Sequence, residues 1–248
     1  MIPLIRGWTD VQRTPQANTR LGVTLAAVAG AANAGGFLAV HQYTSHMTGV
    51  VSGMADALVL GQLTPLFVGL TMLFAFAGGA MCTAILVNLG LRRQLHSAYG
   101  LPLLLESALL LVFGLFGGAI AIAENLFVPL TVVLLCFIMG LQNAVITKIS
   151  RAEIRTTHLT GLVTDMGIEL GKLFYMNTTA SERPVRANRD KLRLHGLLIG
   201  AFSLGAVLGA FGFKHVGYAS TLPLAFALLV LIAKPLWNDV FSPAAPHI

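Results

Sequence analysis

The sequence predicts an all-α membrane protein with six transmembrane helices, two short re-entrant or interfacial helices and two inverted repeats. The chain of 248 residues is 56% hydrophobic and 10% charged, whereas a soluble domain carries about 25% charged residues. It contains six long apolar runs, and a helix needs about 20 apolar residues to cross a bilayer. A nine-residue motif occurs twice. The scarcity of charge excludes soluble, secreted and nucleic-acid-binding proteins, in spite of a net charge of +6.

The six apolar runs are the predicted spans, and Gly, Ala and Leu dominate them. Small residues let membrane helices approach closely, as in Gly205-x-x-x-Gly209. Residues 1–20 lack the pattern of a signal peptide, so we expect them to form a cytoplasmic tail ahead of a retained first span. Residues 237–248 form the predicted C-terminal tail. The runs cover roughly residues 21–40, 66–91, 101–123, 126–147, 194–213 and 216–233.

Two shorter segments, 47–62 and 159–175, have a helical pattern but are too short or too polar to span a bilayer comfortably. They contain the repeated motif, which reads His46-Met-Thr-Gly-Val-Val-Ser-Gly-Met54 and His158-Leu-Thr-Gly-Leu-Val-Thr-Asp-Met166 and is identical at five of nine positions. The duplication predicts two repeats, 21–123 and 124–236. Each repeat consists of a span, a short helix and two further spans.

The positive charges choose between two topologies. With six crossings and the N-terminus inside, Lys214 alone of the 16 Lys and Arg lies outside. With eight crossings and parallel repeats, six of them lie outside. Because loops on the cytoplasmic side carry the excess of Lys and Arg, six crossings are favoured, with both termini cytoplasmic and inverted repeats. The six residues that eight crossings would place outside are Arg92, Arg93, Lys148, Arg151, Arg155 and Lys214.

The two Thr-Gly pairs, Thr48-Gly49 and Thr160-Gly161, are the first candidates for a binding site. Each threonine is expected at the N-cap of a short helix. The start of a helix carries unsatisfied N–H groups and a partial positive charge, so two such starts brought together could bind an anionic or polar solute. His46 and His158 would flank this site. The alternative is that each threonine only caps its helix and each glycine only gives packing clearance.

Three amides lie within the apolar runs near these motifs: Asn33, Gln142 and Asn143. An unpaired amide in hydrocarbon costs several kcal/mol, so each must find a partner. They could line the solute site, or they could make hydrogen bonds between helices.

Four carboxylates within helical segments are candidates for proton coupling, because an ionisable group inside a membrane is by default a candidate functional residue. Those on the short helices do not superpose when the repeats are aligned, which weakens a symmetric two-carboxylate site. The one near the start of the span 101–123 could instead reach water or pair with Arg92 or Arg93. The four are Asp56, Glu106, Asp165 and Glu169.

No enzyme motif is present, so we expect neither catalysis nor a cofactor. The two cysteines, Cys82 and Cys136, lie in apolar runs and form no metal signature. The spacing of His41, His46 and His158 also matches no metal-binding pattern, so no metal site is expected.

The combination of His46-Met-Thr-Gly, Gly140-Leu-Gln-Asn-Ala and Arg155-Thr-Thr-His-Leu-Thr-Gly161 resembles the YoaK-like family of bacterial membrane proteins, which is defined as a domain of unknown function. The resemblance covers roughly residues 20–236. Members often carry Thr-Gly-Asn in the first motif, whereas this chain has Thr48-Gly49-Val50. The resemblance implies a polytopic inner-membrane protein of the transporter type and supplies no substrate or site.

These observations together predict a transporter or channel for a small polar or anionic solute, with its site between the two Thr-Gly helix starts. The expected partners are the lipid bilayer, the solute and a second copy of the chain in a homo-oligomer. The alternative is a structural or accessory subunit of a larger membrane complex. A cavity that gathers the polar residues would favour transport.

Overall fold

A computed structural model describes residue 9 and residues 14–122, 124–150, 154, 156–177 and 184–241. These residues form eight α-helices and one 3₁₀-helix, with no strand among them. Most of the predicted N-terminal tail, and the C-terminal tail after residue 241, lie outside the described residues. The elements are α1 (Pro15–Val40), α2 (Met47–Val59), α3 (Leu63–Arg92), α4 (Gly100–Ile122), α5 (Glu124–Ile149), α6 (Leu159–Phe174), α7 (Arg189–Val216), η2 (Gly217–Thr221) and α8 (Leu222–Phe241).

Five helical stretches of the described chain are long and apolar enough to cross a membrane. The last stretch, 189–241, contains α7, η2 and α8. Gly217 ends α7 with a φ of 64°, a left-handed value that glycine adopts without strain. The two short helices α2 and α6 are not among these stretches. The chain is therefore an all-helical, multi-pass integral membrane protein.

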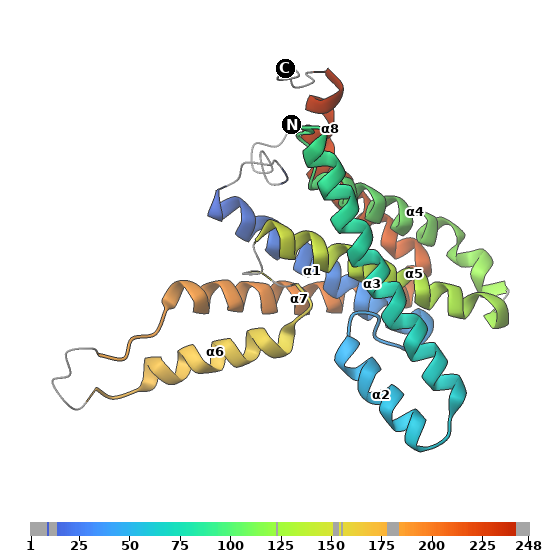
Figure 1. The fold of residues 1–248 in the computed structure, drawn as a ribbon, viewed down its shortest axis with the longest axis horizontal. Helices are drawn as coiled ribbons and strands as arrows, with labels where there is room; N and C mark the ends of the chain where they lie inside the picture. Colours follow the sequence, from blue (N-terminus) through green and yellow to red (C-terminus); the bar gives the residue numbers. More distant parts are fainter. Residues whose placement is uncertain are drawn as a thin grey trace.

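The longest packing interfaces join helices from different halves of the chain: α1 packs along α7, and α3 packs along α5. Both interfaces bring backbones into direct contact at glycines. A Cβ at Gly205 would lie 2.0 Å from the carbonyl oxygen of Ala27, and a Cβ at Gly140 would lie 2.0 Å from that of Phe76. Small residues are what allow membrane helices to approach this closely. In Figure 1, α1 and α5 cross the centre of the fold in opposite directions, and α2 and α6 extend outward from it.

The main core cluster takes one or more fully buried residues from each of five helices: Leu25, Leu110, Met139, Leu198 and Leu228. They come from α1, α4, α5, α7 and α8 respectively. Several polar side chains share this interior, among them a carboxyl group and an amide that are described below.

α8 continues to Phe241, past residue 237 where the sequence predicted the tail to begin. The reason is a contact at its end. Asp239 accepts hydrogen bonds from the backbone N–H of His96 at 2.6 Å and of Ser97 at 2.9 Å. These N–H groups lie in the turn between α3 and α4, so the carboxylate near the end of α8 joins that helix to the turn.

Candidate solute site

Both short helices begin where the predicted segments begin, at Met47 and Leu159, but their N-cap residues lie two positions earlier than predicted. The N-cap residues are His46 for α2 and His158 for α6, so Thr48 and Thr160 lie inside the helices as their second residues. The expectation that the threonines cap the helices was wrong. Neither histidine side chain hydrogen-bonds the start of its helix.

A hydrogen bond holds the chain just ahead of each N-cap histidine. Asn33 Oδ1 on α1 accepts from the backbone N–H of Ser45 at 3.2 Å and from its hydroxyl at 3.0 Å. Asn143 Oδ1 on α5 accepts from the hydroxyl of Thr157 at 2.7 Å. Each bond fixes the chain immediately before the helix begins. We call these two contacts the asparagine latches.

The hydrogen-bond donors in the asparagine latches are Ser45 and Thr157, which the sequence analysis did not identify as site residues. Both precede the histidine of the motif by one position, so an alignment extended by one residue would have paired a serine with a threonine. The structure thus gives the asparagine oxygens partners within the chain. The neighbouring Gln142 donates from Nε2 to the carbonyl oxygen of Leu25 at 3.3 Å, which joins α5 to α1.

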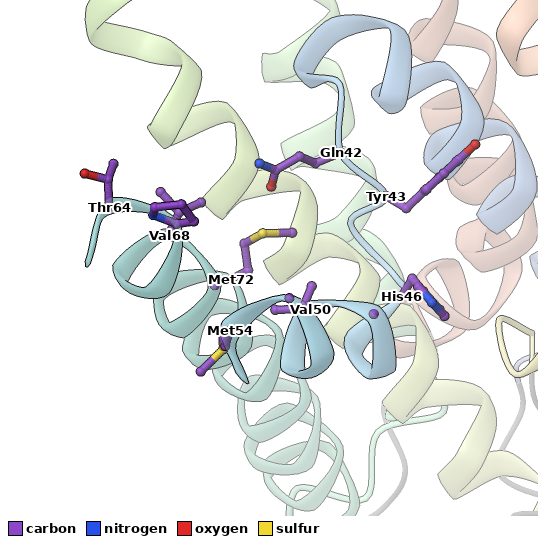
Figure 2. A pocket seen from close by; sticks show the side chains of 12 residues that line it. Gln42, Tyr43, His46, Val50, Met54, Thr64, Val68 and Met72 are labelled. Carbon is purple, nitrogen blue, oxygen red and sulfur yellow. The ribbon is translucent and has the colours of Figure 1, made fainter. Parts of the chain in front are cut away.

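A cavity of about 510 Å³ lies beside the first motif, between α2, α3 and the segment that joins α1 to α2. Its volume falls within the range of about 300–1,000 Å³ typical of ligand pockets. Figure 2 shows Gln42 above Met72 and Val50, with Thr64 at one end of the pocket and His46 at the other. Polar groups therefore stand at both ends of a largely apolar wall.

Gly49 lines the same cavity, and its lack of a Cβ leaves room for the His46 ring beside it. A Cβ at Gly49 would lie 2.3 Å from Cδ2 and 2.7 Å from Nε2 of that ring. The glycine therefore sets where the imidazole can lie. Thr48 is exposed and is not part of the lining.

The second motif lies elsewhere. α6 packs on α7, whereas α2 packs on α3, and none of His158, Thr160 and Gly161 lines the cavity beside the first motif. All three are exposed, and a Cβ at Gly161 would meet nothing within 4 Å. The cavity of the first motif is thus built from one Thr-Gly helix start.

The acidic residues of α6 lie at a second cavity, of about 380 Å³, between α6 and α7. Glu169 accepts from Lys172 Nζ at 2.8 Å and from the backbone N–H of Asn188 at 2.7 Å. The hydrogen bond from Lys172, and then that from Asn188, lower the pKa of Glu169. Asp165 lines this cavity, as does the buried His195, whose Nδ1 has no hydrogen-bond partner.

The remaining two carboxylates differ in their exposure to solvent. Asp56 is exposed on α2. Glu106 on α4 is 0% exposed, and neither of its carboxyl oxygens has a hydrogen-bond partner. It therefore neither reaches water nor pairs with Arg92 or Arg93.

The side chains of the described residues offer no group of three His, Cys, Asp or Glu that could hold a metal ion. Cys82 and Cys136 are free thiols.

Comparison with curated proteins and with solved structures finds no match. A family comparison does: residues 21–234 match the family described as a protein of unknown function, DUF1275. The match reaches into every described span and contains both Thr-Gly motifs. It covers most of the 248 residues, so the chain belongs to the DUF1275 family.

Proposed function

We propose that this protein is a transporter or channel for a small polar or anionic solute, and that the solute binds in the cavity beside His46. The single observation that carries the proposal is this cavity of about 510 Å³, which five residues of the first copy of the repeated motif help to line: His46, Gly49, Val50, Gly53 and Met54. A hollow of this size next to an irregular segment between helices is what a membrane protein needs to bind a solute.

The lining indicates the class of solute. Gln42, Tyr43, His46 and Thr64 supply hydrogen-bonding groups, whereas Val50, Val68 and Met72 supply an apolar wall. The start of α2, with its partial positive charge, lies at the His46 end. These features favour a small molecule with an anionic or hydrogen-bonding group and a short apolar body. No catalytic step and no cofactor enter this proposal.

The proposed topology has six spans, two inverted repeats and both termini in the cytoplasm of a bacterium. Its support is the charge distribution and the contacts of the first helix in each repeat. α1 packs on α7 just as α5 packs on α3, and each asparagine latch has its counterpart in the other half. The resemblance to YoaK-like proteins supports an inner-membrane location.

The test is uptake by the purified full-length protein reconstituted into liposomes. We expect saturable uptake of at least one of three radiolabelled probes, acetate, sulfate or glycerol, above the level of protein-free liposomes. His46→Ala should reduce this uptake. His215→Ala, which alters an exposed histidine at the end of α7, is the matched control and should not.

Failure of all three probes with a folded, monodisperse protein would overturn the proposal. That result would favour the accessory-subunit alternative, and copurification of partner subunits would then be the next measurement.

A further inference from the structure

Glu106 is an acid buried in the membrane-spanning part of the fold. It lies six residues into α4, about 9 Å along the helix from Gly100, within a stretch apolar enough to cross a membrane. Its side chain is 0% exposed, and both carboxyl oxygens lack a hydrogen-bond partner. Buried polar groups in proteins almost always have such a partner, so this one requires an explanation.

Among the described residues, no charged side chain forms an ion pair or a hydrogen bond with Glu106. Leu103 and Leu110, about one turn away on either side, are both 0% exposed and belong to the main core cluster. The adjacent hydroxyl, that of Ser107, donates to the carbonyl oxygen of Ala225 on α8 at 2.8 Å and so is engaged elsewhere.

The helices packed against α4 are α3, α5, η2 and α8. Their described titratable side chains form neither an ion pair nor a hydrogen bond with Glu106. Two of them have partners of their own: Lys148 donates to Asn88, and Asp239 accepts from His96 and Ser97. The full set is Cys82, Arg92, Cys136, Lys148, Tyr218, Lys234 and Asp239.

We propose that Glu106 is a proton-binding site: its carboxyl group holds a proton while it is buried among these helices and releases it when movement of α4 against its neighbours admits water. An ionised carboxylate without a counter-charge or hydrogen bond is far less stable in an apolar interior than the neutral acid. Membrane proteins use intramembrane acids of this kind as proton relays. In the release step the carboxyl O–H bond breaks, the electron pair stays on the carboxylate, and the proton passes to water.

Two other described side chains on helices that pack against α4, Gln142 and Ser220, also have a buried oxygen without a hydrogen-bond partner. Gln142 lies on α5, which packs on α4, and its Oε1 has no hydrogen-bond partner although its Nε2 donates to Leu25. A protonated carboxyl group adds one O–H donor, and these two oxygens are unpaired acceptors on helices that neighbour α4.

The first test needs no solute, so it is independent of the proposed function. Infrared spectra of the full-length protein in lipid at neutral pH should show the C=O stretch of a protonated carboxylic acid. Glu106→Gln should abolish this band, and Asp56→Asn, which removes an exposed acid, should leave it in place. Glu106→Asp should retain a shifted band. Absence of the band from the wild type, or its persistence in Glu106→Gln, would overturn the proposal.

The second test asks whether proton binding at Glu106 is coupled to transport of the solute, and it rests on the proposed function. If acetate, sulfate or glycerol is taken up, an imposed pH gradient should stimulate the wild type several-fold. Glu106→Gln should still take up solute without that stimulation. Equal stimulation of both would overturn the coupling role. If no probe is transported while the infrared band depends on Glu106, the proposed function fails and the proton site stands.

Discussion

Substitution of Gly49 by alanine offers the sharpest test of the cavity beside His46, because the second motif supplies a matched control. Gly49 and Gly161 are both the third residue of a short helix that begins after a histidine. A Cβ at Gly49 would lie 2.3 Å from the His46 ring, well inside van der Waals contact, whereas a Cβ at Gly161 would meet nothing within 4 Å. Both variants therefore gain the higher helix propensity of alanine, but only Gly49→Ala displaces a histidine ring.

The expected magnitudes follow from this contrast. Alanine is favoured over glycine in a helix by up to about 1 kcal/mol, so Gly161→Ala should stabilise the protein slightly. In Gly49→Ala the ring of His46 must turn away, and an off-rotamer side chain costs on the order of 0.5–1.5 kcal/mol. The free energy of unfolding of Gly49→Ala should therefore stay near that of the wild type.

Binding of the solute should separate the variants more clearly. If the imidazole of His46 makes one hydrogen bond to the solute, its displacement removes about 1–1.5 kcal/mol, which corresponds to about a tenfold loss of affinity. The assay is the concentration dependence of uptake in liposomes, beside thermal unfolding of the same samples. An unchanged half-saturating concentration for Gly49→Ala would refute the assignment of the solute site to this cavity.

Three further predictions concern packing, topology and pH. Gly140→Ala should lower the melting temperature strongly, because its Cβ would lie 2.0 Å from a backbone oxygen of α3, whereas Gly200→Ala, with open space around it, should not. On a cysteine-free background, Arg92→Cys should react with a membrane-impermeant reagent from the cytoplasmic side; reaction from outside would establish eight crossings and contradict the inverted repeats. The hydrogen bond from Lys172 lowers the pKa of Glu169 in the folded protein. The contribution of Glu169 to stability is therefore present above its unfolded-state pKa, and it is lost as the pH falls through the lowered folded-state pKa. Glu169→Gln should therefore remove part of the acid destabilisation of the hairpin of α6 and α7, measured by limited proteolysis between these helices.

The sequence was sufficient to predict the helical class, the long spans and the two short helices, since apolar runs and a repeated motif are local signals. The repeat also led to Asn33 and Asn143, although their hydrogen bonds to Ser45 and Thr157 required the turn geometry before each helix. That geometry is also why the threonines lie inside the helices.

Two features of the site could not be predicted from local patterns. The cavity exists because Val68 and Met72 of α3 face α2, which is a matter of packing between helices and not of the motif itself. Glu106 was visible as an acid in an apolar run, but its isolation depends on the cover that α5 and α8 place over α4. Whether a carboxyl group in an apolar run is solvated or buried depends on neighbours that are distant in the sequence.

The exchange of partners between the two halves has a consequence for how the protein is made. α1 packs chiefly on α7, which begins at Arg189, so during synthesis the first helix enters the bilayer long before its main neighbour leaves the ribosome. Contacts between segments so far apart in the chain form slowly. Gly30, where a Cβ would lie 2.1 Å from the carbonyl oxygen of Phe202 on α7 in the folded protein, lacks that neighbour until α7 has been synthesised. The two halves, synthesised as separate polypeptides in one cell, should therefore assemble with each other, whereas the first half alone should be degraded.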